Sequence, residues 1–275
     1  MNKLTQAKRV QVVAALVEGN SIRATCRMTG VCKKAVTKLL VDLGTSCARY
    51  QDEHLRHLPC KRIQCDEIWS FCYAKEKNVP EELKGKLGFG DVWTWVAIDA
   101  DTKLIVSYPV GGRSADYASK FINDLASRLA YRVQLTTDGH KAYLRAVEGA
   151  FGAEVDYAML EKIYAAPPCE GQARYSPADC CGTRKIKVQG NPDMGQVSTS
   201  FVERQNLTMR MCMRRMTRLT NAFSKKIENQ AHAVALHFMH YNFAKVHQTL
   251  RITPAMEAGL ADHVWSLEEI VGLLD

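Results

Sequence analysis

RIQCDEIWSFCY, residues 62–73, is the stretch that decides the fold. Its even-numbered positions include Asp66, Ile68 and Ser70, and its odd-numbered positions carry Ile63, Cys65, Glu67, Trp69, Phe71 and Tyr73. An alternation of this kind is typical of a β-strand, because successive side chains point to opposite faces of a sheet. We therefore predict a body built on a sheet whose first strand carries Asp66.

The segments that follow predict one mixed sheet with helices on its faces. Two β-rich segments, 91–99 and 103–110, are joined by a turn and indicate an antiparallel pair. Later segments predict helices at 115–130 (capped by Ser114) and at about 141–151, and short strands at 133–137 and 155–158. The predicted fold class is α/β, a five-stranded mixed sheet whose first and fourth strands can lie side by side.

Two acids would meet if the first and fourth strands are neighbours. Asp66 lies in the first strand, and Asp138 follows the fourth. Two carboxylates in a partly desolvated site repel each other unless a cation lies between them, and carboxylate oxygens favour a hard ion such as Mg²⁺. Three alternatives stay open: Asp66 is only a solvent-facing strand residue, Glu67 is the acid that matters instead of Asp66, and Asp138 is only a turn residue before Gly139.

A third carboxylate, Glu203, stands at the start of a predicted long helix. Between Glu203 and Glu228 there are seven Lys or Arg and no acid. Arg210 and Arg214 follow Glu203 by seven and eleven positions and would share roughly its face of the helix. Such a face would bind a metal at one end and follow a DNA backbone with the rest. The alternative is structural, because Ser200-x-x-Glu203 also fits a capping box.

The net charge of +8 is concentrated near the amino terminus, where residues 1–64 carry 12 Lys or Arg and 4 Asp or Glu. A basic region ahead of a neutral body is typical of a module that meets phosphates. Helical patterns at 5–18, 21–28 and 32–43, broken at Gly19-Asn20 and Thr29-Gly30, indicate a helix-turn-helix, with Asn20 as a cap. Its last helix would present Lys33, Lys34, Thr37 and Lys38 to the major groove of DNA. A small helical bundle with a solvated lysine face is the alternative.

The composition, 47% hydrophobic and 24% charged over 275 residues, is that of an ordinary globular protein. No apolar run approaches the roughly 20 residues of a membrane helix, and the first residues lack the apolar core of a signal peptide, so we expect a cytoplasmic protein with no membrane partner. The ten cysteines contain no CxxC pair and are expected to be mostly buried free thiols. Cys169, Cys180 and Cys181, in the irregular segment 167–195, lack a clear fourth ligand for zinc.

These patterns predict four regions along the chain. They are a helix-turn-helix domain at 1–45, a linker at 46–60, a catalytic domain at 61–255 and a helical tail at 256–275.

Four sequence blocks carry a resemblance to a known family. They are CDEIWSF around Asp66, TTDGHKAY around Asp138, FVERQNLTMRMCMRR around Glu203, and the tail HYNFAKVHQTLRITPAMEAGL. In this order they resemble the DDE transposases of bacterial insertion sequences, most closely the insertion sequence one family. The resemblance implies a ribonuclease H-like core of the retroviral-integrase kind. It also implies that Asp66, Asp138 and Glu203 hold two Mg²⁺ or Mn²⁺ ions, and that Arg210 contacts the transposon end.

The resemblance further implies a transposase that cleaves double-stranded DNA at terminal inverted repeats and joins the 3′ hydroxyls to target DNA. We expect DNA contacts from Arg204, Arg210 and Arg214. Asn206 would orient the Glu203 carboxylate or the DNA, and His140 either touches a phosphate or is structural. Because two ends must be brought together, we expect a homodimer or larger assembly on nucleoid DNA. The alternatives are a non-catalytic DNA-binding regulator and a structure-specific nuclease that cuts without joining.

Overall fold

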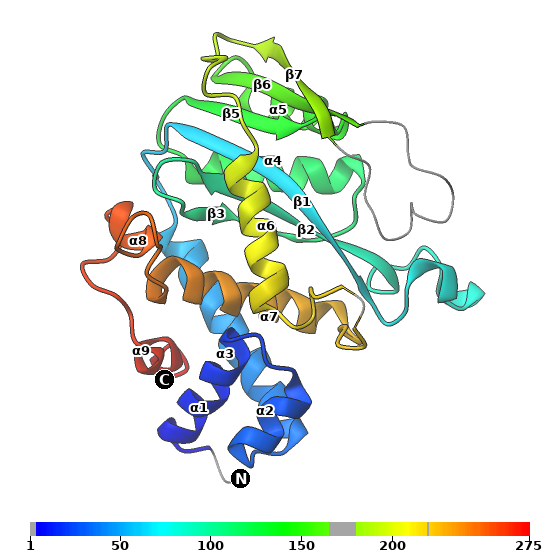
Figure 1. The fold of residues 1–275 in the computed structure, drawn as a ribbon, viewed down its shortest axis with the longest axis vertical. Coiled ribbons are helices and arrows are strands. Elements are labelled where there is room, and N and C mark those ends of the chain that lie inside the picture. The colour runs from blue at the N-terminus through cyan, green and yellow to red at the C-terminus, as the bar shows by residue number, and fades with distance from the viewer. Residues whose placement is uncertain (1–3, 165–179, 219) are drawn as a thin grey trace.

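Seven strands form one mixed sheet in the computed structural model, which describes residues 4–164, 180–218 and 220–275 (Figure 1). The strand order is β3-β2-β1-β5-β6-β7, and β4 pairs with β2. β1 is antiparallel to β2 and parallel to β5. The strands are β1 Arg62–Cys72, β2 Gly90–Asp99, β3 Ile105–Ser107, β4 Val110–Gly111, β5 Val133–Asp138, β6 Val155–Tyr164 and β7 Cys180–Gln189.

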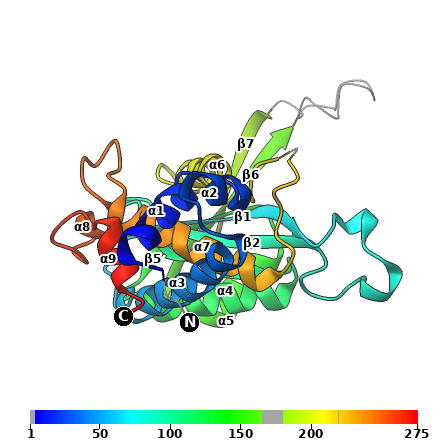
Figure 2. The same ribbon diagram turned by 90° about the horizontal axis from the view of Figure 1, so that it is seen from below.

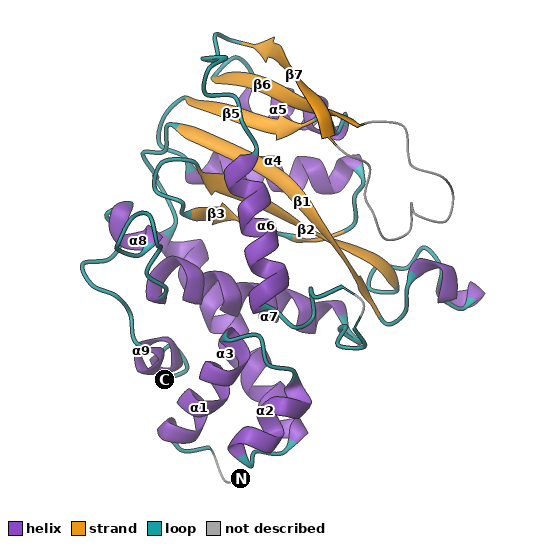
Figure 3. Cartoon of the chain, viewed as in Figure 1, coloured by secondary structure: helices purple, strands orange, loops and turns teal. Residues whose placement is uncertain are grey.

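The order of three antiparallel strands followed by two parallel ones is that of a ribonuclease H-like core, so the predicted fold class is confirmed. The prediction of five strands was too low. The segment 103–110 divides into β3 and β4 around Pro109, which has no N–H to donate to the ladder. β7 lies within the segment 167–195, which was predicted to be irregular. It is a mostly exposed edge strand paired with β6, so no apolar alternation reveals it (Figure 3).

Helices cover both faces of the sheet. The helices are α1 Gln6–Val17, α2 Ile22–Thr29, α3 Lys33–His54, α4 Ala115–Arg128, α5 Ala142–Phe151, α6 Ser200–Cys212, α7 Ile227–Met239, α8 Pro254–Glu257 and α9 Leu267–Gly272. Figure 2 shows α6 on one side of the strands and α4 with α5 on the other. Short 3-10 turns at Glu76–Asn78 and Glu81–Leu83 and a π turn at His240–Ala244 complete the secondary structure.

Side-chain caps define the first two helices. The Thr5 hydroxyl accepts a hydrogen bond from the Lys8 amide, and the Ser21 hydroxyl accepts one from the Ala24 amide. Ser21, rather than the predicted Asn20, therefore caps α2. Gly30 ends α2 in the left-handed region at φ 72°, a conformation that glycine adopts without strain.

The predicted linker at 46–60 is wrong over most of its length, because α3 continues to His54. The inward positions of this half of α3 include Cys47 and Gln51, which are buried against α7. The Gln51 side chain donates to the Ala235 carbonyl at 3.2 Å. A helix is recognised in a sequence by apolar residues that repeat every three or four positions. The buried thiol of Cys47 and the buried amide of Gln51 do not form such a repeat.

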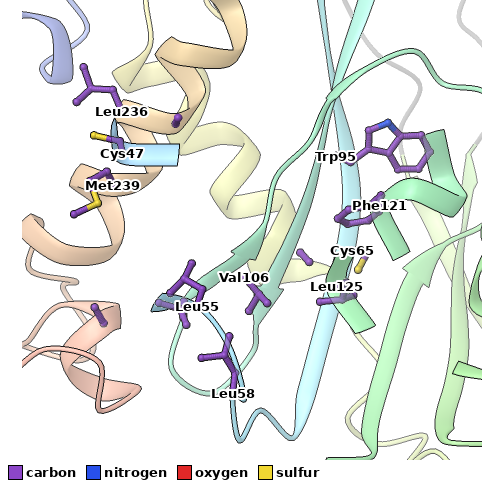
Figure 4. Close-up of a cluster of buried hydrophobic side chains, with 14 of the residues drawn as sticks. Cys47, Leu55, Leu58, Cys65, Trp95, Val106, Phe121, Leu125, Leu236 and Met239 are labelled. Atoms are coloured by element: carbon purple, nitrogen blue, oxygen red, sulfur yellow. The ribbon is translucent and has the colours of Figure 1, made fainter. Parts of the chain in front are cut away.

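The amino-terminal helices share one core with the body. Gly44 lets α3 approach α7 closely, because a Cβ there would lie 2.5 Å from the His232 Cβ. A continuous buried cluster runs from Cys47, Leu236 and Met239 past Leu58 to Phe121 under the sheet (Figure 4). Helices α1 to α3 are thus packed on the body along this seam.

The predicted tail at 256–275 is mostly loop with two short helices, and α8 already begins at Pro254. Trp265 packs in the tail against the rings of Tyr50 and Phe243, with centroids 5.1 and 5.2 Å away. α9 packs on α1, so the two ends of the chain lie near each other. Across the described residues, every helix is too short or too polar to cross a bilayer.

Candidate metal centre

The pairing of β1 with β5 brings the first two predicted acids together. The parallel register pairs Cys65 with Thr137, so the next residues along the two strands are Asp66 and Asp138. Carboxylate oxygens of Asp66, Glu67 and Asp138 all lie within 4.8 Å of one another. Asp138 is the last residue of β5, where the backbone amide of His140 donates to its Oδ1 at 3.0 Å.

Glu67 is the third member of this cluster. It occupies the α4/α5 face of β1, with Trp95 as its cross-strand partner, and its side chain is only 1% exposed. Arg113 Nη2 lies 3.6 Å and His140 Nε2 3.9 Å from its carboxylate oxygens, and its Oε1 accepts no hydrogen bond within the described residues. Burial, and then the charge of Asp138, raises the pKa of Glu67 to about 8.

Sequence reasoning treated Glu67 as an alternative to Asp66, since neighbours on a strand face opposite sides. The structure gathers both, because Asp138 lies where β5 ends and can be reached from either face. Adjacency to Asp66 was the only signal for Glu67 in the sequence.

Asp66 is held by two hydrogen bonds. Asn206 Nδ2 donates to its Oδ2 at 2.8 Å, and the Glu67 amide donates to its Oδ1 at 2.8 Å. Burial raises the pKa of Asp66 to about 6, and the nearby charges of Asp138 and Glu203 act in the same direction. Asn206 was predicted to orient the Glu203 carboxylate or the DNA, but the carboxylate that it contacts in the structure is that of Asp66.

Glu203 comes to the same cleft from α6. The Gln64 side chain of β1 accepts hydrogen bonds from the amides of Phe201 and Val202, which fixes the first turn of α6 beside β1. Lys162 donates to Glu203 Oε2 and the Thr199 hydroxyl donates to Oε1, each at 2.5 Å. The predicted capping box at Ser200 is wrong, since α6 begins after Thr199 and has no side-chain cap.

The acids line one open cleft with a volume of about 560 Å³. Asp66, Asp138 and Glu203 reach it from β1, β5 and α6, although Glu203 lies outside the tight cluster of ligand atoms. The remaining walls are Arg113, Gly139, His140, Leu160, Glu161, Lys162, Tyr164 and Thr199. The arrangement offers oxygen ligands at the centre and cations at the rim.

The predicted basic face of α6 is only partly present. α6 ends at Cys212, because Met213 adopts an extended conformation and is buried with Met216. Arg214 therefore lies beyond the helix, whereas Arg204 is exposed on it. Arg210 donates to the carbonyls of Met216 at 3.0 Å and Trp69 at 3.4 Å.

The residues predicted to read DNA lie at the start of α3. Lys33, Lys34 and Lys38 are exposed and Thr37 is half-buried. Lys38 is paired with Asp42 at 2.5 Å, one turn along the helix. His140 stacks near Trp95, with ring centroids 6.1 Å apart, and lines the acid cleft.

The cysteines follow the expected pattern in part. Cys47, Cys60, Cys65 and Cys72 are buried free thiols. Cys180 and Cys181 are exposed, and Cys169 lies outside the described residues. Within the described ranges the acid cluster is the one group of potential metal ligands.

No protein-family model and no curated protein sequence matches the chain. A solved piggyBac transposase synaptic complex with hairpin DNA aligns over 98% of this chain and 69% of its own, with a TM-score of 0.42 and 10% identity. A Mos1 transposase paired-end complex with the left transposon end aligns over 56% of this chain and 60% of its own, with a TM-score of 0.24 and 15% identity. At these scores the likeness assigns no family, and the fold assignment rests on the strand order.

Proposed function

We propose that the chain is a metal-dependent DNA transposase of the DDE type, encoded by a bacterial insertion sequence, with Asp66, Asp138 and Glu203 as its acids. The observation that carries the proposal is the meeting of these three side chains, from β1, β5 and α6, in one open cleft. The sequence blocks around them add the resemblance to insertion-sequence transposases. The helix-turn-helix supplies the DNA-binding part of the same proposal.

The donor set fits a hard divalent cation. The clustered ligand atoms are all carboxylate oxygens, and the mutual repulsion of Asp66 and Asp138 is relieved when a cation lies between them. Asp66 and Asp138 would hold the metal, two Mg²⁺ or Mn²⁺ ions in the full site, with Glu203 completing the set. When bound, such ions polarise a phosphodiester and stabilise the leaving 3′ oxygen.

The surrounding residues position these acids and the DNA. Asn206 fixes the Asp66 carboxylate, and Lys162 holds Glu203 while presenting a positive charge to the cleft. Arg113, whose guanidinium lies over the Trp93 ring with its Cζ 4.6 Å from the centroid, would bind a phosphate at the rim. The liberated 3′ hydroxyl would then attack the target phosphodiester, exchanging one ester for another without a covalent protein intermediate.

The test is a cleavage and joining assay with DNA that carries the inverted repeats flanking the gene. We expect Mg²⁺-dependent cuts at the repeat ends and a joined product with a target plasmid, both abolished by EDTA. Cutting without a joined product would favour a structure-specific nuclease. Binding of the repeats without any cutting would make the protein a regulator and overturn the proposal.

A transposase must hold two DNA ends together, so we propose a homodimer or larger assembly on DNA. Light scattering after size-exclusion chromatography of the protein bound to its repeat DNA measures this mass. A complex with one protein chain per duplex would contradict the assembly.

A further inference from the structure

A second hollow, of about 680 Å³, lies at the other end of α6 from the acid cleft. Its walls are the α1–α2 turn, the starts of α2 and α3, residues 212–215 and 220–225, and one side of α7. We call it the interdomain groove. None of its lining residues is an acid. Five cationic side chains line it: Arg23, Lys33, Arg214, Arg215 and Lys225.

These cations are not neutralised by the protein. In the part of the chain that the structure describes, none of the five forms an ion pair with a carboxylate. Arg215 is the most enclosed, and its Nη1 donates to the Ser224 hydroxyl at 2.8 Å and the Asn229 carbonyl at 3.0 Å. A partly buried guanidinium without a counter-charge is costly, so an anion entering the groove would be stabilised there.

His237 is a second, independent sign of a ligand. It is 5% exposed and lines the groove, yet neither ring nitrogen has a hydrogen-bond partner among the described residues. A buried imidazole with both nitrogens unsatisfied is costly, because buried polar groups are normally bonded. The polar partner that it lacks would come from whatever fills the groove.

The two walls of the groove come from different parts of the chain but are held together. Gly19, at the end of α1, lies so close to the end of α6 that a Cβ there would be 3.1 Å from the Met211 carbonyl oxygen. The α3–α7 seam at Gly44 fixes the same two parts further along. An occupant would therefore touch the helix-turn-helix and the body at once.

We propose that the interdomain groove binds the backbone phosphates of duplex DNA, so that one duplex contacts the helix-turn-helix and the body together. The partner rests on the proposed function. A chain of phosphates fits better than a single anion, because the cations are spread over α2, α3 and the segments 212–215 and 220–225 of an open hollow. Lys33 and Thr37 in its wall also belong to the helix predicted to read DNA.

The geometry also gives a spacing. α6 has 13 residues, so it spans ~18 Å at a rise of about 1.5 Å per residue. A duplex lying along α6 would thus place the phosphates in the groove about five base pairs from the bond in the acid cleft, at ~3.4 Å per step.

The experiment measures binding of a random-sequence duplex of about three helical turns by fluorescence anisotropy over a salt series, in EDTA. The variant is Arg23→Ala/Lys225→Ala, because both side chains are exposed. Each lost phosphate contact should lower the slope of log affinity against log salt by ~0.9, so we expect a decrease of about 2 and roughly tenfold weaker binding. The matched control is Lys120→Ala/Arg145→Ala on α4 and α5, which loses the same charge on the opposite face and should keep the wild-type slope.

Equal slopes for the two double variants would overturn the groove proposal. Arg215→Lys, which keeps the charge, should bind more tightly than Arg215→Gln, provided that both give the wild-type circular dichroism spectrum. If tripolyphosphate displaced the duplex at equal phosphate concentration, the groove would be a site for small polyphosphates and the DNA proposal would be wrong. Because binding in EDTA needs no cleavage, a wild-type protein that never cuts DNA would refute the proposed function and leave this result intact.

Discussion

The acid cleft and the interdomain groove lie at opposite ends of α6 and differ in charge, since the cleft has acids at its centre and cations at its rim. Asp66, Asp138 and Glu203 line the cleft, whereas the groove has five cations and no acid in its walls. Clustered carboxylates repel DNA until metal ions lie between them, whereas a groove whose charged groups are all cations attracts DNA without acting on it. The groove would thus supply most of the affinity for DNA, and the cleft would cleave it.

The largest effect should come from the cleft alone. Asp138→Asn would remove a proposed metal ligand worth several kcal/mol to the transition state, so we expect roughly a thousandfold slower Mg²⁺-dependent cleavage. DNA affinity in EDTA should not fall, because the groove is untouched. Glu148→Gln, on the exposed side of α5, is the matched control and should cleave normally. If the Asp138→Asn protein still cleaved DNA, the acid cluster would not be the site of cleavage.

The second largest effect should come from the contact between α3 and α7 at Gly44, which fixes the two walls of the groove. Gly44→Ala places a Cβ 2.5 Å from the His232 Cβ and 2.6 Å from its carbonyl oxygen, so α3 and α7 must separate. Overpacking of this kind costs about 1–3 kcal/mol, which in a chain of this size lowers the melting temperature by roughly 5 °C. DNA affinity should fall with it while Mg²⁺ affinity is retained.

Gly149→Ala is the control for this change. Gly149 lies in α5 with no atom in reach of an added Cβ, so its replacement should leave or slightly raise the melting temperature. A stable Gly44→Ala variant with wild-type DNA affinity would mean that the groove does not depend on the seam.

The charges of the cleft should also set the pH dependence of stability. The pKa of Asp66 is raised to about 6 and that of Glu67 to about 8, so both are protonated more readily in the folded chain than in the unfolded one. Stability without metal is therefore highest when they are protonated and falls as pH rises through these values. In Glu67→Gln the decrease in the free energy of unfolding between about pH 6 and about pH 8 should disappear. This removes at least about 1.4 kcal/mol from the total decrease.

Thermal unfolding in EDTA from below pH 6 to above pH 8 measures this difference. Parallel curves for the wild type and Glu67→Gln would show that the Glu67 charge has no part in the fall. Added Mg²⁺ should restore the wild type at high pH, because the ion neutralises the clustered carboxylates.

The smallest effect should come from the paired lysine of α3. Lys38→Ala/Asp42→Ala removes an exposed ion pair worth ~0.2–1 kcal/mol and leaves the net charge unchanged, so DNA affinity should change less than about twofold. Lys33→Ala should lower the salt slope by ~0.9 instead. Equal slopes for the two variants would place Lys33 outside the DNA contact.

The central strands could be predicted because their signals are local, whereas the exposed edge strand β7 and the division of the segment 103–110 could not. Alternation marks β1 and β2, and Asp138 follows a short apolar run, so the neighbour relation of β1 and β5 was enough to bring Asp66 and Asp138 together. The end of α6 could not be predicted. No Gly or Pro stands near Met213, and the helix stops because Met213 and Met216 are drawn into the core.

The sequence by itself indicated the central strands of the sheet, the proximity of Asp66 and Asp138 and the excess of positive charge at the amino terminus, since these follow from periodicity, strand order and composition. Only the tertiary structure decided that Glu67 joins the acids, that α3 runs on into the body, and that Arg23 and Arg215 line one groove. These depend on contacts between distant segments, such as Gly44 with His232, where the space left by a missing side chain sets the packing. No local pattern records such a contact, because each residue taken alone fits an ordinary helix.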